Sequence, residues 1–334
     1  MAKRKTKKKG KDILKWPRII LPILFAVYLV AFQFWIAPKS EASWVTYFLV
    51  ENGFLLTLAF CVLMTLLSVR KWQFFLVWIL LTGGEIFIAG RPSFGSRPVD
   101  APAKTLRVLT YNVAHYNIDR PAAIQVMRDS QADLIFIQEA CKLDSQKEEG
   151  EALCKELKGY TFVVSSTNMI LSKHPIKLER SLDVPTKWPV KQYPQAMVTT
   201  PLGKIRVMCV HMEPSWVGGF PPQFSEYIPV ISKVVQDRRA QVDLLFAALR
   251  PSKEPVIMAG DFNGPPGSES LYRISQHFTD CYSATERGFG FTLLPKLPYK
   301  RIDYVWTRGL TPLQSEVINS KASDHMPVLT TLGR

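Results

Sequence analysis

Cysteine is scarce in this chain of 334 residues, which contains five. There is no Cys-x-x-Cys pair and no Cys/His spacing typical of zinc, so nothing indicates a structural zinc module. In an exported domain, Cys141 and Cys154 could form a disulfide across a short polar segment. Cys209 lies in a strand-like run, where we expect a small buried hydrophobic residue.

Acidic residues are also few, because 28 Asp and Glu stand against 42 Lys and Arg, for a net charge of +14. The excess is uneven: residues 1–18 hold nine Lys or Arg and one Asp, a net of +8 that leaves +6 for the rest. No basic helix with interleaved aromatic residues appears, and no internal repeat is visible. The net charge therefore describes a basic tail more than a nucleic-acid surface.

Long apolar runs are present in the N-terminal third. Ile19 to Ala37 carries no charge over 19 residues, which as a helix span roughly 28 Å, close to the hydrocarbon thickness of a bilayer. Further runs cover 44–69 and 72–89, separated by Arg70-Lys71. Neither shows an amphipathic face, which argues against a buried hairpin of a soluble core. We expect a transmembrane region of about three helices over residues 19–90.

The basic tail, residues 1–18, orients this region. Lys and Arg accumulate on the cytoplasmic side, so the tail is expected to be cytoplasmic, and three spans would place everything after about Gly90 in a periplasmic or extracellular location. An alternative for the first run is a cleaved signal peptide, with Ser40-Glu41-Ala42 as the small-residue site. Residues 91–104 are rich in Pro, Gly and Ser and are expected to be a linker before a domain over 105–334.

In that domain, several apolar strands end on polar residues of similar chemistry. Four apolar residues lead into Gly260, Asp261 and Asn263, which precede a Gly/Pro turn. The period-2 alternation of a strand points Asp261 and Asn263 to the same side. An Asx-turn explains this stretch equally well by itself. The other strands end at Asn112, Glu139, His211, Asp303 and the pair Asp324-His325.

Together these strand ends supply the parts of a phosphoryl-transfer site. Carboxylates bind a hard divalent cation, whereas amides and imidazoles bind phosphoryl oxygens or move protons. Phosphate-ester hydrolysis requires a cation, an activated water and a group that stabilises the leaving oxygen. Six such strand ends in one domain favour an enzyme over a structural protein.

These residues resemble the endonuclease/exonuclease/phosphatase superfamily, which includes DNase I, abasic-site endonucleases, neutral sphingomyelinases and inositol-polyphosphate phosphatases. The resemblance covers residues 105–332 and implies an α/β fold, a four-layer α/β/β/α sandwich of two mixed sheets (DNase I-like). The helices in front resemble those of membrane-anchored bacterial members. The matching motifs are Thr110-Tyr-Asn112-Val, Ile137-Gln138-Glu139, Val210-His211, Gly260-Asp-Phe-Asn263, Arg301-Ile-Asp303-Tyr and Ser323-Asp324-His325-Met-Pro-Val.

The resemblance implies catalytic roles for five residues. Asp261 would orient or deprotonate the attacking water, and Asn263 would hold the scissile phosphate. His211 would bind phosphate or assist the leaving group. His325, held by Asp303, would contact the phosphoryl oxygen or act as acid or base. Whether Asp261 or His325 is the base stays open.

The resemblance also implies a site for Mg²⁺, with Mn²⁺ as the other possible ion. Glu139 is expected as the main ligand, with Asn112 beside it and Asp324 close. Trp216 and Arg301 are further candidates for substrate binding. Trp216 belongs to an aromatic, Gly/Pro-rich loop whose first residues depart from the family, which more often has Leu and a small polar residue there.

Three functions are compatible with these residues. The first is a membrane-anchored, divalent-metal-dependent phosphodiesterase, which includes a nuclease. The second is a lipid-headgroup phosphodiesterase or phosphatase of the sphingomyelinase or phosphoinositide kind, which the membrane helices favour. The third is a non-catalytic membrane scaffold with the same fold, which the complete set of motif residues disfavours. The expected substrate is thus a phosphate ester of a nucleic acid or a lipid headgroup.

Overall fold

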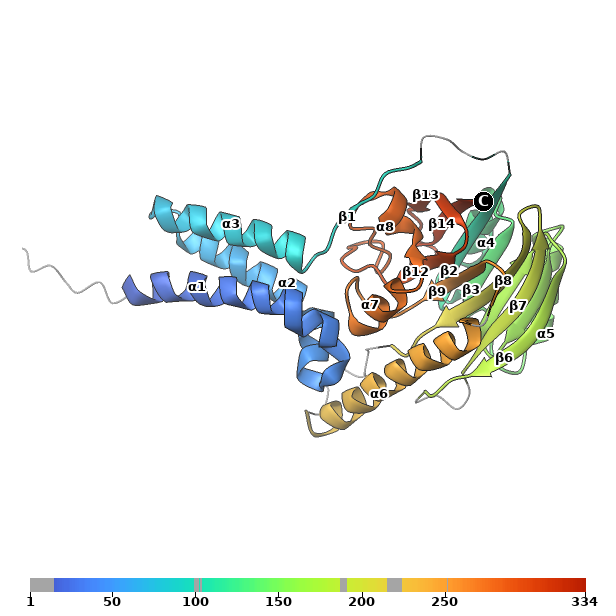
Figure 1. Cartoon of the computed structure of the whole chain (residues 1–334), viewed down its shortest axis with the longest axis horizontal. Helices are drawn as coiled ribbons and strands as arrows, with labels where there is room; N and C mark the ends of the chain where they lie inside the picture. The colour runs from blue at the N-terminus through green and yellow to red at the C-terminus, as the bar shows by residue number, and fades with distance from the viewer. Residues whose placement is uncertain (1–14, 99–101, 103, 187–190, 215–223, 251) are drawn as a thin grey trace, which may run out of the picture.

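The structure, a computed structural model, describes residues 15–98, 102, 104–186, 191–214, 224–250 and 252–334. An elongated bundle of helices α1 to α3 projects from one side of a domain built on two β-sheets (Figure 1). The segment between α1 and α2 lies against helices α6 and α7 of the domain. The two parts therefore meet at a packed junction.

Three apolar helices form the bundle. They are α1 (Lys15–Ala31), α2 (Trp44–Leu67) and α3 (Trp72–Ile88), with a π-helical turn η1 (Phe32–Ile36) and a 3-10 turn η2 (Ala37–Ala42) after α1. Ser43 caps α2, because its hydroxyl accepts the Thr46 N–H and Thr46 Oγ1 accepts the Ser43 N–H. The buried interior of the bundle consists of Phe25, Leu29, Cys61 and Trp78.

By length and apolar composition, one helical stretch among the described residues could cross a membrane, Trp16–Ala42. The apolar stretches Phe54–Leu67 and Trp72–Ile88 are shorter. An apolar helix near the N-terminus serves either as an anchor or as a signal sequence. The prediction of three spans is therefore supported in part, by one helix.

Two six-stranded mixed sheets form the domain, in the orders β10-β12-β9-β8-β7-β6 and β13-β14-β2-β3-β5-β4. The pairs β8–β9 and β2–β3 are parallel. The first sheet consists of β6 (Ile176–Asp183), β7 (Gln192–Thr200), β8 (Gly203–His211), β9 (Val256–Asp261), β10 (Thr279–Asp280) and β12 (Asp303–Arg308). The second consists of β2 (Thr105–Asn112), β3 (Leu134–Gln138), β4 (Thr161–Ser165), β5 (Asn168–Ser172), β13 (Thr311–Val317) and β14 (Val328–Gly333).

The two sheets pack face to face, and helices cover their outer faces. In β9, Ile257 and Ala259 enter the core between the sheets, whereas Val256 and Met258 pack under the helices, as the period-2 alternation of a strand requires. The first sheet is covered by α6 (Phe224–Leu249) and α7 (Glu269–Ser275), and the second by α4 (Arg120–Asp129) and α5 (Gln146–Glu156). A short helix, α8 (Cys281–Thr285), follows β10. The predicted α/β/β/α sandwich is confirmed.

Strand register brings the polar strand ends side by side. His211 lies opposite Asp261 on β8 and β9, and Asp303 lies opposite Asp261 on β9 and β12. In the other sheet, Asn112 lies opposite Gln138, so Glu139 follows directly. Polar residues that are far apart in sequence thereby gather at one rim.

Gly260 makes this close approach possible. Its φ is +154°, and a Cβ built at this position would lie 1.8 Å from the carbonyl oxygen of Val210 on β8. Any side chain here would push the two strands apart. The glycine therefore fixes how closely Asp261 approaches His211.

The predicted linker is partly folded. Strand β1 (Ser93–Phe94) pairs with β11 (Arg287–Gly288), and Arg97 forms an ion pair with Glu286. These contacts fasten the first half of residues 91–104 to the domain.

All five cysteines are free, so the suggested disulfide does not form. Cys141 is buried and its thiol donates to the Ser166 carbonyl at 3.7 Å, whereas Cys154 lies on α5. Cys209 is buried between the sheets, as its place in a strand predicts.

Candidate active site

Asp261 is fixed by three N–H groups at the end of β9. The Asn263 N–H donates to Asp261 Oδ1 at 2.8 Å, and the side-chain amides of Asn112 and Asn263 each donate to Oδ2 at 3.1 Å. Asn263 Nδ2 also donates to the Met212 carbonyl at 3.1 Å. Asn263 has a φ of +48°, a strained conformation that persists because these bonds hold it.

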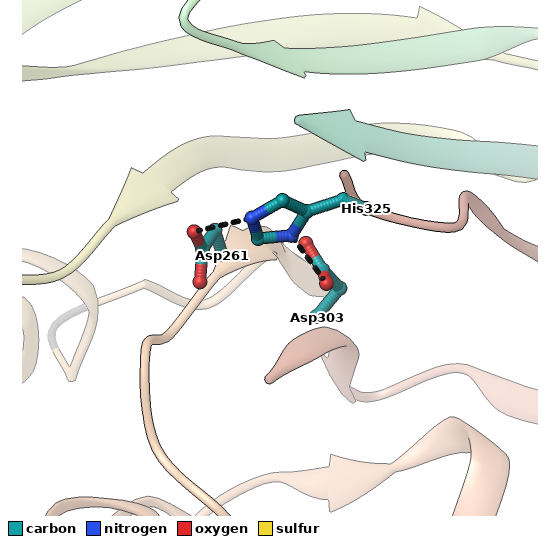
Figure 2. A group of neighbouring side chains, drawn as sticks. All are labelled: Asp261, Asp303 and His325. Atoms are coloured by element: carbon teal, nitrogen blue, oxygen red, sulfur yellow. Dashed lines mark hydrogen bonds and ion pairs between the residues drawn. The ribbon is translucent and has the colours of Figure 1, made fainter. Parts of the chain in front are cut away.

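The imidazole of His325 lies between two carboxylates (Figure 2). Its Nδ1 is 2.9 Å from Asp303 Oδ2, and its Nε2 is 3.8 Å from Asp261 Oδ2. All three residues are buried. Asp303 thereby sets the orientation of the ring and directs Nε2 toward Asp261.

Burial and charge act in opposite ways on this pair. Burial raises the pKa of Asp261 to about 7, an effect that His325 opposes and Asp303 reinforces. Burial alone would lower the pKa of His325, but the carboxylates of Asp303 and Asp261 outweigh it and raise that pKa to about 10. At neutral pH His325 is therefore a protonated imidazolium beside a carboxylate whose pKa is near 7.

Glu139 forms the opposite corner of the site. It follows β3 with a φ of +52° and is the more exposed carboxylate, with 28% of its side chain accessible. Its Oε1 accepts Asn112 Nδ2 at 3.1 Å, and its Oε2 lies 3.5 Å from His115 Nε2. Asn112 thus donates to both Glu139 and Asp261.

His211 differs from His325 in charge. Its Nε2 lies 3.8 Å from Glu139 Oε1 and 3.7 Å from Asp261 Oδ2. Burial lowers its pKa well below the usual value, and the charges of Lys191 and His325 lower it further. The two imidazoles at this rim are therefore held in opposite charge states, His211 neutral and His325 protonated.

A family model described as the endonuclease/exonuclease/phosphatase family matches residues 109–325, well over half of the chain. The chain belongs to the endonuclease/exonuclease/phosphatase family. The matched region begins in β2 and ends at His325, so it contains every strand end that forms the site.

Solved structures of this family share the fold. A family member from Beutenbergia cavernae has a TM-score of 0.52 at 18% identity and covers 69% of this chain and 72% of that one. A family protein from Leptotrichia buccalis has a TM-score of 0.51 at 18% identity, over 69% of this chain and 100% of that one. TDP2 of D. rerio, in a complex with single-strand DNA product, has a TM-score of 0.50 at 18% identity, with the same coverage.

Curated relatives match a shorter stretch. A UPF0294 protein of Yersinia pseudotuberculosis is 30% identical over 89 residues, which are 27% of this chain and 34% of that one. A UPF0294 protein of Vibrio vulnificus is 31% identical over 103 residues, which are 29% of this chain and 34% of that one. The matched stretch thus spans about a third of the length of these relatives.

The site of this family member has the donor set of a divalent cation. Members of the family typically act as hydrolases on phosphoesters and use divalent metal ions. Asp261, Asp303 and His325 offer ligand-type atoms within 4.8 Å of one another. Glu139 and Asp261 also lie on either side of one amide donor, Asn112. This concentration of carboxylate oxygens fits a hard cation that would neutralise them.

The structure brings seven of the predicted residues to one rim: Asn112, Glu139, His211, Asp261, Asn263, Asp303 and His325. Asp324 lies next to them. Its Oδ1 accepts the Ser323 hydroxyl at 3.2 Å, and its charge adds to the field around His325. Its role as a metal ligand stays a prediction.

The structure gives no support to Arg301 as a substrate-binding residue. Its guanidinium is buried, donates to Asp280 Oδ2 at 2.6 Å and lies 4.6 Å from the ring centre of Tyr304. These contacts point the charge into the fold. Trp216 lies outside the described residues.

Two polar residues near the site, His115 and Lys191, are not among the residues that the sequence motifs predict. His115 reaches Glu139 because residues 114–116 all have positive φ, which turns the chain back toward the rim. Lys191 is buried and donates to the Met212 carbonyl at 3.1 Å, 3.7 Å from Glu213 Oε2. Neither is the residue at which an apolar strand ends, so strand-end patterns do not reveal them.

Proposed function

We propose that the protein is a membrane-anchored, divalent-metal-dependent phosphoesterase that hydrolyses phosphodiester bonds. One observation carries the proposal. A protonated imidazole, His325, is oriented by buried Asp303 toward Asp261, and Glu139 and neutral His211 face the same space. Asp261, a carboxylate with a pKa near 7, suits a general base. The imidazolium of His325, held in place by Asp303, suits a group that stabilises the negative charge developing on the phosphoryl oxygens.

Each residue has a distinct task in this reaction. Glu139, with Asn112 and Asp324 close to it, would hold Mg²⁺ or Mn²⁺, which supplies charge neutralisation at the phosphate when bound. Asp261 orients and deprotonates the attacking water. His325 donates from Nε2 to a phosphoryl oxygen, and the pKa values of the two residues support Asp261 as the base.

The side-chain amide of Asn263 and the imidazole of His211 complete the substrate site. Asn263 Nδ2 lies 3.1 Å from Asp261 Oδ2 and can turn to a phosphoryl oxygen when substrate enters. His211 is neutral, so it can bind the phosphate or share a proton with the leaving oxygen. The hydrolysis then needs no covalent intermediate on the chain.

The helical bundle supports the membrane anchor. Its outer surface carries large apolar side chains such as Leu24, Leu66 and Leu80, which are 58%, 64% and 75% exposed. A soluble protein rarely exposes so continuous an apolar surface. With the basic tail inside, three spans place the active site in the periplasm or outside the cell.

One observation favours a lipid headgroup as the substrate. The chain that follows Asn263 is in contact with the bundle and the segment after it. A Cβ at Gly267 would touch the guanidinium of Arg91, and the Glu269 N–H donates to the Ser40 hydroxyl. The segment that leads from Asn263 to α7 therefore lies on the side of the domain that faces the anchor, where α7 is drawn beside the bundle (Figure 1). A phosphate ester at the membrane surface is within reach there.

The test is turnover by the full chain in lipid nanodiscs with Mg²⁺ or Mn²⁺. The substrates are plasmid DNA, RNA, sphingomyelin, phosphatidylinositol phosphates and bis(4-nitrophenyl) phosphate, with wild type compared to Asp261→Ala. Asp243→Asn, which removes an exposed ion pair with Arg273, is the control. We expect metal-dependent turnover that drops at least about a thousandfold in Asp261→Ala and not in the control.

Two results contradict the proposal. Absence of turnover with every substrate would favour a scaffold, and turnover that survives Asp261→Ala would remove Asp261 from the reaction. The relative rates on sphingomyelin and nucleic acid decide between the two substrate classes. A C-terminal reporter that scores as cytoplasmic would refute the three-span topology.

A further inference from the structure

A buried ion pair joins the bundle to the domain. Glu41, in η2, and Arg238, on α6, are both fully buried, and Arg238 Nε donates to Glu41 Oε1 at 3.1 Å. The hydroxyl of Ser270 also donates to Glu41 Oε1. A carboxylate and a guanidinium are costly to bury, so each stabilises the other only while the bundle stays docked.

The bundle also completes the N-terminus of α7. Glu269 N–H donates to the Ser40 hydroxyl at 2.8 Å, and Glu41 N–H donates to Glu269 Oε2 at 3.0 Å. Ser268, the residue before α7, makes no side-chain cap. A residue from the other part of the chain thus supplies the cap that the helix lacks.

The other end of Arg238 holds the catalytic loop. Its Nη1 donates to the carbonyls of Glu213 at 2.8 Å, Phe262 at 3.1 Å and Asn263 at 3.2 Å. A Cβ at Gly264 would lie 2.8 Å from Arg238 Nη2, so the guanidinium packs directly beneath this loop. One cation therefore spans from the anchor segment to the backbone of Asn263.

The contacts of the Arg238 guanidinium support Asn263, whose backbone is strained. Asn263 has a φ of +48°, which requires support from its surroundings, and its amide N–H fixes Asp261. The carbonyls of Phe262 and Asn263 are held by Arg238, whereas Met212, next to Glu213, accepts from Asn263 Nδ2. Displacement of the guanidinium would release both loops at once.

We infer that Glu41 and Arg238 are positioning residues through which the docked anchor holds Asp261 and Asn263 in their catalytic geometry. The catalytic loop is then complete only when the segment around Glu41 remains attached. A signal peptide cleaved after this segment would leave Arg238 without Glu41. The inference on turnover rests on the proposed function, whereas the inference on loop geometry does not.

The experiment uses the full chain in nanodiscs and the variant Glu41→Gln, which keeps the shape of the side chain and removes its charge. Hydrogen exchange followed by mass spectrometry measures the peptide that contains residues 260–268. Steady-state hydrolysis of bis(4-nitrophenyl) phosphate gives kcat and KM separately. Asp243→Asn is the matched control, because it removes an exposed ion pair between α6 and Arg273 of α7 without touching Glu41, Glu269 or the loop carbonyls.

We expect Glu41→Gln to speed exchange at 260–268 about tenfold or more, with the two sheets as protected as in wild type. We expect kcat to fall about tenfold to a hundredfold with KM changed less than about twofold, because a small misplacement of the reacting groups acts on the chemical step. Arg238→Lys keeps the charge but has fewer donors in a different geometry, so the variant should still fold while its kcat falls as in Glu41→Gln.

Ser270→Ala is the milder variant should Glu41→Gln fold poorly. It removes one hydrogen bond to Glu41 and should change exchange and kcat in the same direction, by a smaller factor. Unchanged exchange at 260–268 in both variants overturns the inference, whether or not wild type hydrolyses any ester. A uniform loss of protection with unchanged kcat per folded molecule also overturns it, since that outcome marks a purely structural contact.

Discussion

Replacement of Asp303 by Asn tests whether its charge keeps His325 protonated. The amide of Asn has nearly the same shape and can still accept the Nδ1–H, so the change isolates the charge. Asp303 Oδ2 lies 2.9 Å from His325 Nδ1, and both side chains are buried. At an effective dielectric constant of about 20, opposite charges about 4 Å apart attract by about 4 kcal/mol, which corresponds to about three pKa units.

The pKa of His325, raised to about 10 in the native chain, should therefore fall to about 7 in Asp303→Asn. In wild type, kcat/KM should rise as Asp261 loses its proton near pH 7 and stay level up to pH 9.5. In the variant, kcat/KM should decline from about pH 7, and its maximum should lie about a hundredfold lower, since oriented acid–base groups contribute factors of that size.

The assay is hydrolysis of bis(4-nitrophenyl) phosphate by the full chain with Mg²⁺ from pH 5.5 to 9.5. Asp243→Asn, an exposed carboxylate that pairs with Arg273, is the control and should follow wild type. A decline of kcat/KM at the same alkaline pH in Asp303→Asn and wild type would refute the reasoning. The charge of Asp303 would then not raise the pKa of His325.

Further predictions concern the fold, the metal and pH. Gly260→Ala should lower the free energy of unfolding by at least about 3 kcal/mol in urea denaturation, because its Cβ would lie 1.8 Å from the Val210 carbonyl, and full stability would refute this strand contact. Glu139→Gln should raise the Mg²⁺ concentration for half-maximal turnover at least about tenfold, and EDTA should abolish turnover reversibly; an unchanged metal requirement would contradict its ligand role. The pKa of His325 in the fold lies above its value of roughly 6.5 in the unfolded chain, so its contribution to stability is full below pH 6.5 and is lost as pH rises toward 10. The melting temperature of the metal-free chain should accordingly fall over that range, less so in His325→Gln, and equal slopes would argue against a protonated His325.

Local patterns in the sequence predict most of the sandwich but not its irregular edges. The hairpin of β7 and β8 and the helix α6 follow from alternation and amphipathic spacing. Strand β6 does not, because Ile176–Asp183 is mostly polar and is held as an edge strand by its pairing with β7. Strand β13 contains Pro312, which argues against a strand unless the residue lies at an edge, as it does here.

Long-range contacts determine the surroundings of Arg301 and Arg238, which the sequence motifs do not predict. Arg301 lies in a site motif, yet its partner is Asp280, which no motif connects to it. Arg238 is one of several charges on a helix, and its partner Glu41 is 197 residues away in the chain. Charge partners at such separations follow from the packing of whole elements, which spacing in the sequence does not encode.

The sequence by itself indicates the candidate site residues, because a polar side chain at the end of an apolar strand is a local pattern. Asp261 and Asn263 lie at the end of β9, whereas Asp303 begins β12 and His325 precedes β14, so for these two the pattern marks the start of a strand. Only the tertiary structure decides their charge states. The sequence pattern assigns both His211 and His325 to strand ends and does not distinguish their charges. In the structure, burial keeps His211 neutral, and two buried carboxylates keep His325 protonated. Desolvation and Coulomb attraction depend on distances through space, and those distances exist only once the sheets have packed.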